Sequence, residues 1–199
     1  MRVFECEQGS AEWFSARLGI PSASMYDKIV TAKGDWSTQA NGYINQLVAE
    51  ELTGERVPIF QNQWMLRGVE LEPEARNLYI QTNQVKVHEM GFILHDDIDA
   101  GCSPDGLIGR DGGLEIKCPA PATHVEYLRG GKLPNRYKQQ VMGCLWVTDR
   151  QWWDFMSYHP DMKPLIVRVE RDEEYIASLA KHVTKAVGLI KENVNQFED

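Results

Sequence analysis

The sequence predicts a single α/β or α+β domain in which a central mixed β-sheet is flanked by helices. Apolar residues recur with the 3.6-residue period of helices near both ends of the chain, whereas the middle third alternates with the two-residue period of strands. No internal repeat, low-complexity tract or linker divides the 199 residues. Helices on both sides of a sheet bury both of its faces, which favours this fold class.

The first third of the chain is predicted to be helical. A short helix is expected from Ser10 to Arg17, and Ser22 or Ser24 can cap a second one. Residues 43–52 keep helical periodicity until a glycine stops it. The face of a further helix is marked by four apolar residues, Leu71, Ala75, Leu78 and Tyr79.

Strands and two more helices are expected in the rest of the chain. The strand patterns lie at 85–88, 91–94, 102–108, 114–118, 151–158 and 165–169, and the helical patterns at 137–147 and 172–197. The last helix carries an apolar stripe that we interpret as a packing surface: Ile176, Leu179, Val183, Val187, Ile190 and Val194. Trp152 and Trp153 are consecutive in a strand, so one should pack on each face of the sheet.

Charge and motif content exclude several classes of function. The 21 basic and 29 acidic residues give a net charge of −8, which argues against a surface that coats nucleic acid or anionic membrane. No apolar run is long enough for a signal peptide or a membrane span, so we expect a cytoplasmic protein without membrane association. Neither HExxH, GxxxxGK[ST] nor GxSxG occurs, which leaves zinc proteases, P-loop ATPases and serine hydrolases unsupported.

The cysteines and one acidic cluster have ordinary explanations. Four cysteines show no CxxC spacing, so buried, reduced thiols are favoured over a disulfide framework or an iron–sulfur cluster: Cys6, Cys102, Cys118 and Cys144. The segment 95–99, HDDID, offers several metal-ligand residue types, but an exposed connection between strands is the preferred interpretation.

Charged residues gather in one predicted hairpin, formed by SPDGL at 103–107 and LEIKCP at 114–119. Alternation places Glu115 and Lys117 on one face of their strand. A turn centred near Asp111 would bring Asp105 opposite Lys117 and diagonal to Glu115. Three charges would then converge on one face of the hairpin.

Two carboxylates on rigid strands suit Mg²⁺ or Mn²⁺, which prefer oxygen ligands and bind substrate phosphates. A neighbouring lysine can orient or deprotonate an attacking water, or neutralise charge that develops on a phosphate. Asp105, Glu115 and Lys117 therefore indicate phosphodiester hydrolysis. The alternative is an exposed hairpin with an ordinary cross-strand ion pair.

Glu72 and Gln140 strengthen the metal-site hypothesis. Glu72 lies on the same helical stripe as Ala75 and Tyr79, and an inward carboxylate requires a cation. Alternatively, Glu72 is a solvated charge near a helix start, with Pro73 in the first turn. Gln140 lies on the inward face of its helix, where a phosphate or a water could satisfy its amide.

Ordered motifs along nearly the whole chain resemble one known family. They are EWFSARLG at 12–19, SAS at 22–24, GVELEPEA at 68–75, the two hairpin segments, YKQQ at 137–140, WDF at 153–155 and ERDE at 170–173. Together they resemble the phage lambda-type exonucleases, the YqaJ-like viral recombinases of the PD-(D/E)xK nuclease superfamily. The resemblance implies a restriction-endonuclease-like core.

The resemblance also implies roles for individual residues. Asp105, Glu115 and the carbonyl of Ile116 would bind Mg²⁺, which Mn²⁺ could replace, and Glu72 would support the metal cluster. Lys117 would activate water. Gln140 would position the nucleophile or a terminal phosphate, and the 5′-phosphate pocket would comprise Arg17, Ser24 and Ser103. From the residues alone, Arg17 could equally be a surface side chain and both serines could be helix caps.

The activity that the resemblance implies is 5′-to-3′ degradation of one strand of linear double-stranded DNA in a phage-infected or lysogenic bacterial cytoplasm. It further implies a ring-shaped homotrimer and transfer of the 3′ single-stranded tail to a single-strand annealing recombinase. A basic channel could include Arg67, Arg129, Lys132, Arg136 and Lys138, although residues 129–132 could instead form a plain turn. Met65 matches either a strand-splitting wedge or a core residue.

Two alternatives to this function stay open. One is another nuclease of the same superfamily, either a site-specific or structure-specific endonuclease or a cluster-containing exonuclease. The other is a catalytically inert DNA-binding scaffold for recombination, against which the retention of Asp105, Glu115 and Lys117 counts.

Overall fold

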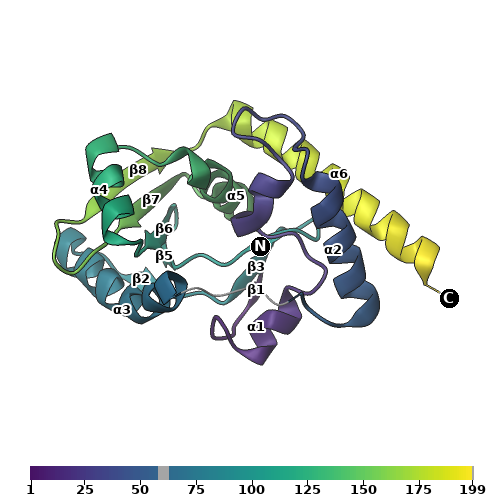
Figure 1. The fold of residues 1–199 in the computed structure, drawn as a ribbon, viewed down its shortest axis with the longest axis horizontal. Coiled ribbons are helices and arrows are strands. Elements are labelled where there is room, and N and C mark those ends of the chain that lie inside the picture. Colours follow the sequence, from purple (N-terminus) through teal and green to yellow (C-terminus); the bar gives the residue numbers. More distant parts are fainter. Residues whose placement is uncertain (58–62, 199) are drawn as a thin grey trace.

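A five-stranded mixed sheet forms the core of the computed structural model (Figure 1). The structure describes residues 1–57 and 63–198, apart from the side chain of Met65. The predicted role of Met65 therefore lies outside the described residues. In spatial order the strands are β2 (Val87–His88), β5 (Gly106–Ile108), β6 (Gly112–Lys117), β7 (Trp152–Ser157) and β8 (Leu165–Glu170). The β6–β7 pair is parallel and the other three pairs are antiparallel, which confirms the predicted mixed sheet.

A second, three-stranded antiparallel sheet was not expected. It consists of β1 (Arg2–Phe4), β3 (Phe92–Leu94) and β4 (Gly101–Cys102), with β3 in the centre. The predicted strand 102–108 is wrong, because residues 103–105 leave the small sheet and the chain enters the large one at β5. This crossing segment contains Ser103 and Asp105, so it places two candidate site residues between the sheets.

The helices follow the predicted order with one addition. They are α1 (Ala11–Ala16), α2 (Ala40–Thr53), α3 (Gln63–Asn83), α4 (Pro121–Gly130), α5 (Lys138–Thr148) and α6 (Glu173–Phe197), with 3₁₀ turns at Ala23–Lys28 and Asn135–Tyr137. As predicted, the Ser10 hydroxyl caps α1 and Gly54 ends α2 in the left-handed conformation. Helix α4, which begins with Pro121 in its first turn, is not among the helices predicted from the sequence.

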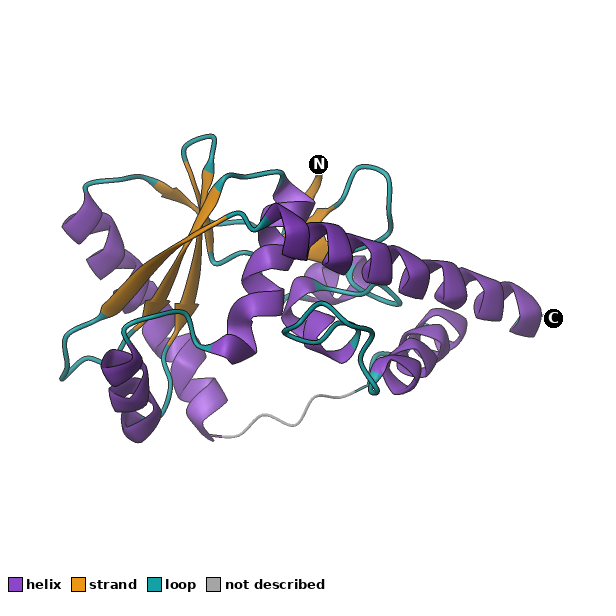
Figure 2. Ribbon diagram, turned by 90° about the horizontal axis from the view of Figure 1, so that it is seen from above, coloured by secondary structure: helices purple, strands orange, loops and turns teal. Residues whose placement is uncertain are grey.

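Helices cover both faces of the large sheet (Figures 1 and 2). On one face α3 packs through Ala75 and Tyr79 against Leu114 and Ile116 of β6. On the other face α5 packs against β7, and α6 and α2 behind it continue the larger hydrophobic cluster, which includes Trp153. Trp152 packs with the first cluster, so the two tryptophans take opposite faces as predicted. All six residues of the α6 stripe are buried, which confirms that the stripe is a packing surface.

The hairpin register differs from the prediction by two residues. Gly106 pairs with Leu114 and Ile108 with Gly112, so Asp105 lies opposite Glu115 instead of Lys117. The error arose because Gly112 and Gly113 were assigned to the turn, whereas both belong to β6. A Cβ on Gly113 would lie 2.3 Å from the indole of Trp153, so the glycine is required by packing. A shift of two residues keeps every side chain on its face, and the charges still converge.

Helix α3 begins well before the position expected from its apolar face. Pro73 lies inside the helix and not in its first turn, so the interpretation of Glu72 as a helix-start charge is wrong. Ser22 stands at the start of a 3₁₀ turn, but its hydroxyl makes no capping bond, and Ser24 lies within that turn. Within the described part of the chain, no helix is long and apolar enough to cross a membrane.

Candidate active site

Two carboxylates meet at the junction of β5 and β6. Asp105 immediately precedes β5, and its Oδ2 accepts a 2.6 Å hydrogen bond from the backbone N–H of Ile116. The next residue, Gly106, leaves room for Val87 of the neighbouring strand β2, because a Cβ there would lie 2.1 Å from a methyl group of Val87. Glu115 of β6 is 1% exposed, and Asp105 is also buried. The fold therefore holds the carboxylates of Asp105 and Glu115 and the backbone of Ile116 close together in one buried place.

Lys117 and Gln140 contact the same oxygen of Glu115. The ammonium of Lys117 forms an ion pair with Glu115 Oε1, and the amide of Gln140 on α5 donates to that atom over 2.6 Å. Glu115 Oε2 is buried and has no hydrogen-bond partner among the residues that the structure describes. The inward orientation predicted for Gln140 is thus observed, and one carboxylate oxygen remains available for a ligand.

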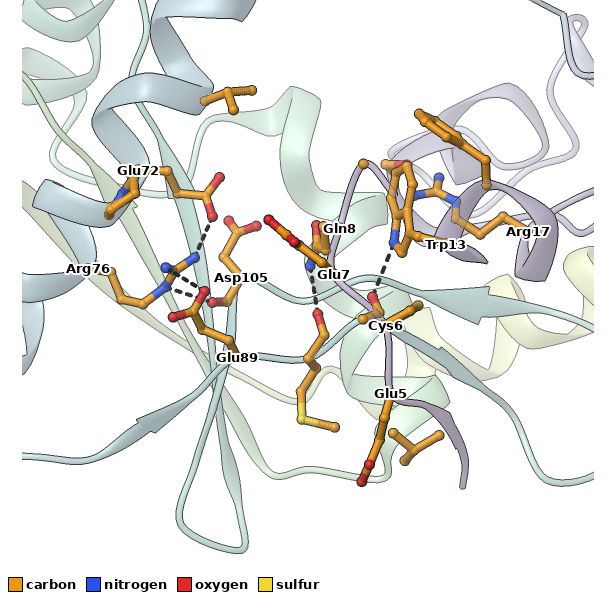
Figure 3. Close-up of a pocket in the computed structure, with 18 of the residues that line it drawn as sticks. Glu5, Cys6, Glu7, Gln8, Trp13, Arg17, Glu72, Arg76, Glu89 and Asp105 are labelled. Carbon is orange, nitrogen blue, oxygen red and sulfur yellow. Dashed lines mark hydrogen bonds and ion pairs between the residues drawn. The ribbon is translucent and has the colours of Figure 1, made fainter. Parts of the chain in front are cut away.

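Glu72 reaches the acidic centre from α3. Its Oε1 lies 2.5 Å from a guanidinium nitrogen of Arg76, one turn later on the helix. A second nitrogen of Arg76 donates to the backbone carbonyl of Asp105 over 3.1 Å. Figure 3 shows Glu72, Arg76 and Asp105 in one wall of the cleft. Arg76 was missed from the sequence, although its position four residues after Glu72 is the spacing of a helical ion pair.

The acids and the lysine shift one another's pKa values. Burial and the nearby Asp105 carboxylate raise the pKa of Glu115 to about 8 and that of Glu72 to about 7. Burial also raises the pKa of Asp105, although Lys117 opposes that shift. Burial lowers the pKa of Lys117, but Glu115 and Asp105 outweigh it, and the pKa ends above its usual value. Lys117 is consequently a cation at neutral pH.

The acidic centre fits a hard divalent cation. Buried carboxylates that raise each other's pKa are stabilised by positive charge, and no donor within residues 1–57 and 63–198 reaches Glu115 Oε2. Within residues 1–57 and 63–198, no three histidine, cysteine, aspartate or glutamate side chains are grouped so that they could hold a metal by themselves. A metal here would therefore use Asp105, Glu115 and a backbone carbonyl, and complete its shell with water or phosphate, as Mg²⁺ commonly does.

Arg17 forms the core of a second polar site. Its guanidinium is buried and donates to the hydroxyls of Ser22 over 3.0 Å and of Ser103 over 3.4 Å. The guanidinium also lies 3.9 Å from the ring centroid of Trp13, whose indole N–H donates to Ser103 over 2.9 Å. Ser24 adjoins this group through a 3.4 Å contact with Ser22. The alternative of a surface Arg17 is therefore wrong.

The Arg17 site is suited to an anion. Burial, together with the positive charge of Arg56, lowers the pKa of Arg17 to about 10, so the side chain stays charged at neutral pH. Arg17 makes no carboxylate ion pair in the described part of the chain, and its Nε is buried without a hydrogen-bond partner. A desolvated guanidinium with adjacent hydroxyls is a good receptor for phosphate. Trp13 and Ser22 were not foreseen as members of this site.

One cleft of about 1500 Å³ connects the two sites. Figure 3 shows Glu72 and Asp105 near one end of it and Trp13 with Arg17 near the other. Ser24 also lines the cleft. The structure thus gathers acidic and cationic residues from α1, α3, and the segment before β5 around one space, which separate sequence motifs could not establish.

Two of the basic residues proposed for a channel, Arg67 and Lys138, have local partners. Arg67 contacts His159 at 3.4 Å, and Lys138 pairs with Asp172 at 3.6 Å and covers the ring of Tyr175. The acidic segment 95–99 is a connection between β3 and β4 in which Asp96 and Asp99 pair with basic groups, which agrees with the preferred interpretation. All four cysteines are free thiols, and Cys6 is the one that is not fully buried.

A family model for the YqaJ-like viral recombinase domain matches residues 12–151, which span every candidate site residue described above. The chain belongs to the YqaJ-like viral recombinase family. No match is found among curated proteins. The family resemblance predicted from the ordered motifs is therefore confirmed.

Three solved structures similar to this YqaJ-like chain are of proteins described as exonucleases. The alkaline exonuclease LHK-Exo from Laribacter hongkongensis is 36% identical, with a TM-score of 0.85 and coverage of 94% of this chain and 95% of that one. A complex of LHK-Exo with dAMP gives 35% identity, a TM-score of 0.86 and the same coverage. A phage-related exonuclease from Haemophilus somnus 129PT shares the fold at 16% identity, with a TM-score of 0.67 over 90% of this chain and 96% of that one. These relationships support a nuclease role in phage-type recombination.

Proposed function

We propose that the protein is a Mg²⁺-dependent 5′-to-3′ exonuclease that degrades one strand of linear double-stranded DNA and leaves a 3′ single-stranded tail. The observation that carries the proposal is the single cleft in which a buried acidic centre faces a buried arginine site. The first suits hydrolysis of a phosphodiester, and the second suits capture of a terminal phosphate. Relatives described as exonucleases at 35–36% identity agree with this assignment.

Asp105, Glu115 and the carbonyl of Ile116 would hold the divalent ion, with Glu72 beside them. When bound, such an ion polarises the scissile phosphate and lowers the pKa of a bound water. The oxygens of Asp105 are fixed by the N–H of Ile116, so this ligand is pre-organised before substrate enters. Mn²⁺ should substitute for Mg²⁺, because both prefer oxygen ligands.

Lys117 would act as a cation at the scissile phosphate. Glu115 and Asp105 raise the pKa of Lys117, and its ammonium would donate hydrogen bonds to the attacking water or to the phosphate. Gln140 fixes Glu115 through Oε1, which leaves Oε2 directed to a ligand. Gln140 therefore orients the acidic centre and is close enough to position a water.

Arg17 would bind the 5′-phosphate with Ser22, Ser24 and Ser103. A fixed distance between this pocket and the acidic centre would place the first phosphodiester bond of a 5′ end for cleavage. Polarity and dependence on a free end would then follow from one geometric relation. Phosphate contacts carry no base information, so little sequence preference is expected.

The proposal is tested with linear duplexes labelled at either end and digested in Mg²⁺, Mn²⁺ or a chelator. We expect mononucleotide release from the 5′ side, complete loss of activity in the chelator, and faster digestion of 5′-phosphorylated than of 5′-hydroxyl ends. Intact circular plasmid is the matched control and should remain uncut. Cleavage of the circle would support an endonuclease, and DNA binding without any cleavage would support an inert scaffold.

The assembly and the partners are proposed on the same family basis. We propose a homotrimer in the bacterial cytoplasm that delivers its product to a single-strand annealing recombinase. Light scattering after size exclusion should give three times the chain mass, and a monomer at working concentration would refute the trimer. The annealing protein should co-purify with the wild-type protein after an added nuclease has removed any DNA that could bridge the two. Failure to co-purify would refute a direct complex.

A further inference from the structure

One guanidinium links three separate segments at the wall of the cleft. Arg76, which is 9% exposed, lies 2.5 Å from Glu72, 2.8 Å from Glu89 and 3.1 Å from the backbone oxygen of Asp105. Its three nitrogens serve these three acceptors separately. Glu72 lies on α3, Glu89 lies between β2 and β3, and Asp105 precedes β5. Figure 3 shows all four side chains together.

The backbone of the segment that carries Asp105 is held by side chains from other parts of the chain. It crosses between the two sheets, so Asp105 lies outside the ladder of β5. On the side away from Arg76, the amide of Gln8 donates to the carbonyls of Pro104 and Met90 over 3.0 and 2.9 Å. Arg76 therefore supplies the contact to the backbone of Asp105 itself, from the helix that also presents Glu72.

We propose that Arg76 is a positioning residue that fixes the placement of Asp105 and Glu72 relative to each other for catalysis. The inference deepens the proposed nuclease function and rests on it. The carboxylates of Asp105 and of the half-buried Glu72 lie on different segments and repel each other. Arg76 pairs with the Glu72 carboxylate and donates to the backbone carbonyl of Asp105, so one side chain ties the two segments together. The planar fork of arginine allows three directed bonds, whereas the single ammonium of lysine cannot reproduce them.

The first test compares Arg76→Gln and Arg76→Lys with wild type on 5′-phosphorylated linear duplex at saturating metal. Loss of a residue that orients metal-binding groups commonly costs about 10- to 100-fold in activity. We expect kcat to fall by about that factor in Arg76→Gln with KM changed less than about threefold, and Arg76→Lys to recover part of the loss. Arg168→Gln is the matched control, because Arg168 pairs with buried Asp154 in the sheet, apart from the site residues. It should lower thermal stability without lowering kcat.

The second test measures amide exchange by NMR in metal-free protein. The N–H of Ile116 donates to Asp105 Oδ2, so it reports the placement of that side chain directly. Exchange at Ile116 should accelerate in Arg76→Gln relative to the other amides of β6, whereas Arg168→Gln should leave that ratio unchanged. If Arg76→Gln does not fold, Arg76→Lys decides the question through the same two measurements.

A double-mutant cycle with Glu72→Gln completes the test. If Arg76 acts partly through Glu72, Arg76→Gln should cost several-fold less in the Glu72→Gln background than in wild type. Equal losses in both backgrounds, or unchanged kcat with unchanged exchange at Ile116, would overturn the positioning role. Inactive wild-type enzyme would instead refute the proposed function, so the two failures are distinguishable.

Discussion

At the scale of single residues, the site depends on what each carboxylate oxygen contacts. Glu115 Oε1 pairs with the ammonium of Lys117 and accepts a hydrogen bond from Gln140. Oε2 is buried and has no donor among the described residues. A buried carboxylate oxygen without a hydrogen-bond donor costs free energy. This atom is therefore a natural contact for a bound cation or water. Hydrogen bonds from Lys117 and Gln140 to one oxygen also fix the direction of the other.

Removal of Lys117 should mainly affect the chemical step. For Lys117→Ala we expect kcat to fall by about 10²- to 10³-fold with KM nearly unchanged, the range for loss of one electrostatic stabiliser of a transition state. Single-turnover digestion of linear duplex measures this. Lys86→Ala removes an exposed lysine of the same charge and should be neutral. A Lys117→Ala enzyme within threefold of wild type would exclude the assigned role.

Removal of Arg17 should abolish the discrimination between DNA ends. Arg17→Ala is expected to slow digestion of 5′-phosphorylated duplex by about 10- to 100-fold, which corresponds to a charged hydrogen bond of about 1.5–3 kcal/mol. The 5′-hydroxyl substrate should be affected much less, because it lacks the bound group. Arg110→Ala, at an exposed hairpin position, is the charge-matched control. Equal slowing on both substrates would show that Arg17 does not recognise the phosphate.

At the scale of secondary-structure elements, most helices and the central strands were predictable from periodicity. The long α6 carries its apolar stripe at regular spacing, and α1 and α2 have a serine cap and a glycine stop. Strand β1 was not predictable, because its three residues are exposed and gain their structure only by pairing with β3. The hairpin register was also beyond local pattern, since Gly113 resembles a turn residue until Trp153 is seen to occupy its Cβ position.

Two glycines distinguish packing from backbone propensity. Gly113→Ala should destabilise the protein by about 1–3 kcal/mol, because the added Cβ would meet the Trp153 ring at 2.3 Å. Gly188→Ala in α6 has open space around the new atom and should stabilise by about 0.5–1 kcal/mol. Urea unfolding measures both changes. Equal effects of the two substitutions would show that the contact with Trp153 is not what requires a glycine.

The candidate site was predictable where a motif coincided with a strand or helix period. Asp105, Glu115 and Lys117 follow from hairpin alternation, which survives a register error of two residues. Arg76 was missed because its importance arises from Glu89 and the carbonyl of Asp105, which are distant in sequence. The Arg17 pocket was equally ambiguous in sequence, since serines near helix starts usually serve as caps.

At the scale of the whole molecule, the proposed substrate, DNA, carries the same sign of charge as the protein. The net charge of −8 disfavours general DNA adhesion, while Arg17, Arg56 and Arg76 line the cleft. Affinity for linear duplex should therefore fall at least about tenfold between about 50 and 200 mM salt, because bound phosphates release counterions. Fluorescence anisotropy with duplexes of different sequence measures this at constant length. A strong base preference that persists at high salt would contradict phosphate-based binding.

Anomalous X-ray diffraction from crystals soaked in Mn²⁺ is the decisive test of the proposed metal site. We expect one peak in contact with the carboxylates of Asp105 and Glu115, and no such peak in crystals of Asp105→Asn treated identically. Wild-type crystals in which these carboxylates point away from each other with no ion between them would contradict the assignment of this cleft as a metal-dependent nuclease site.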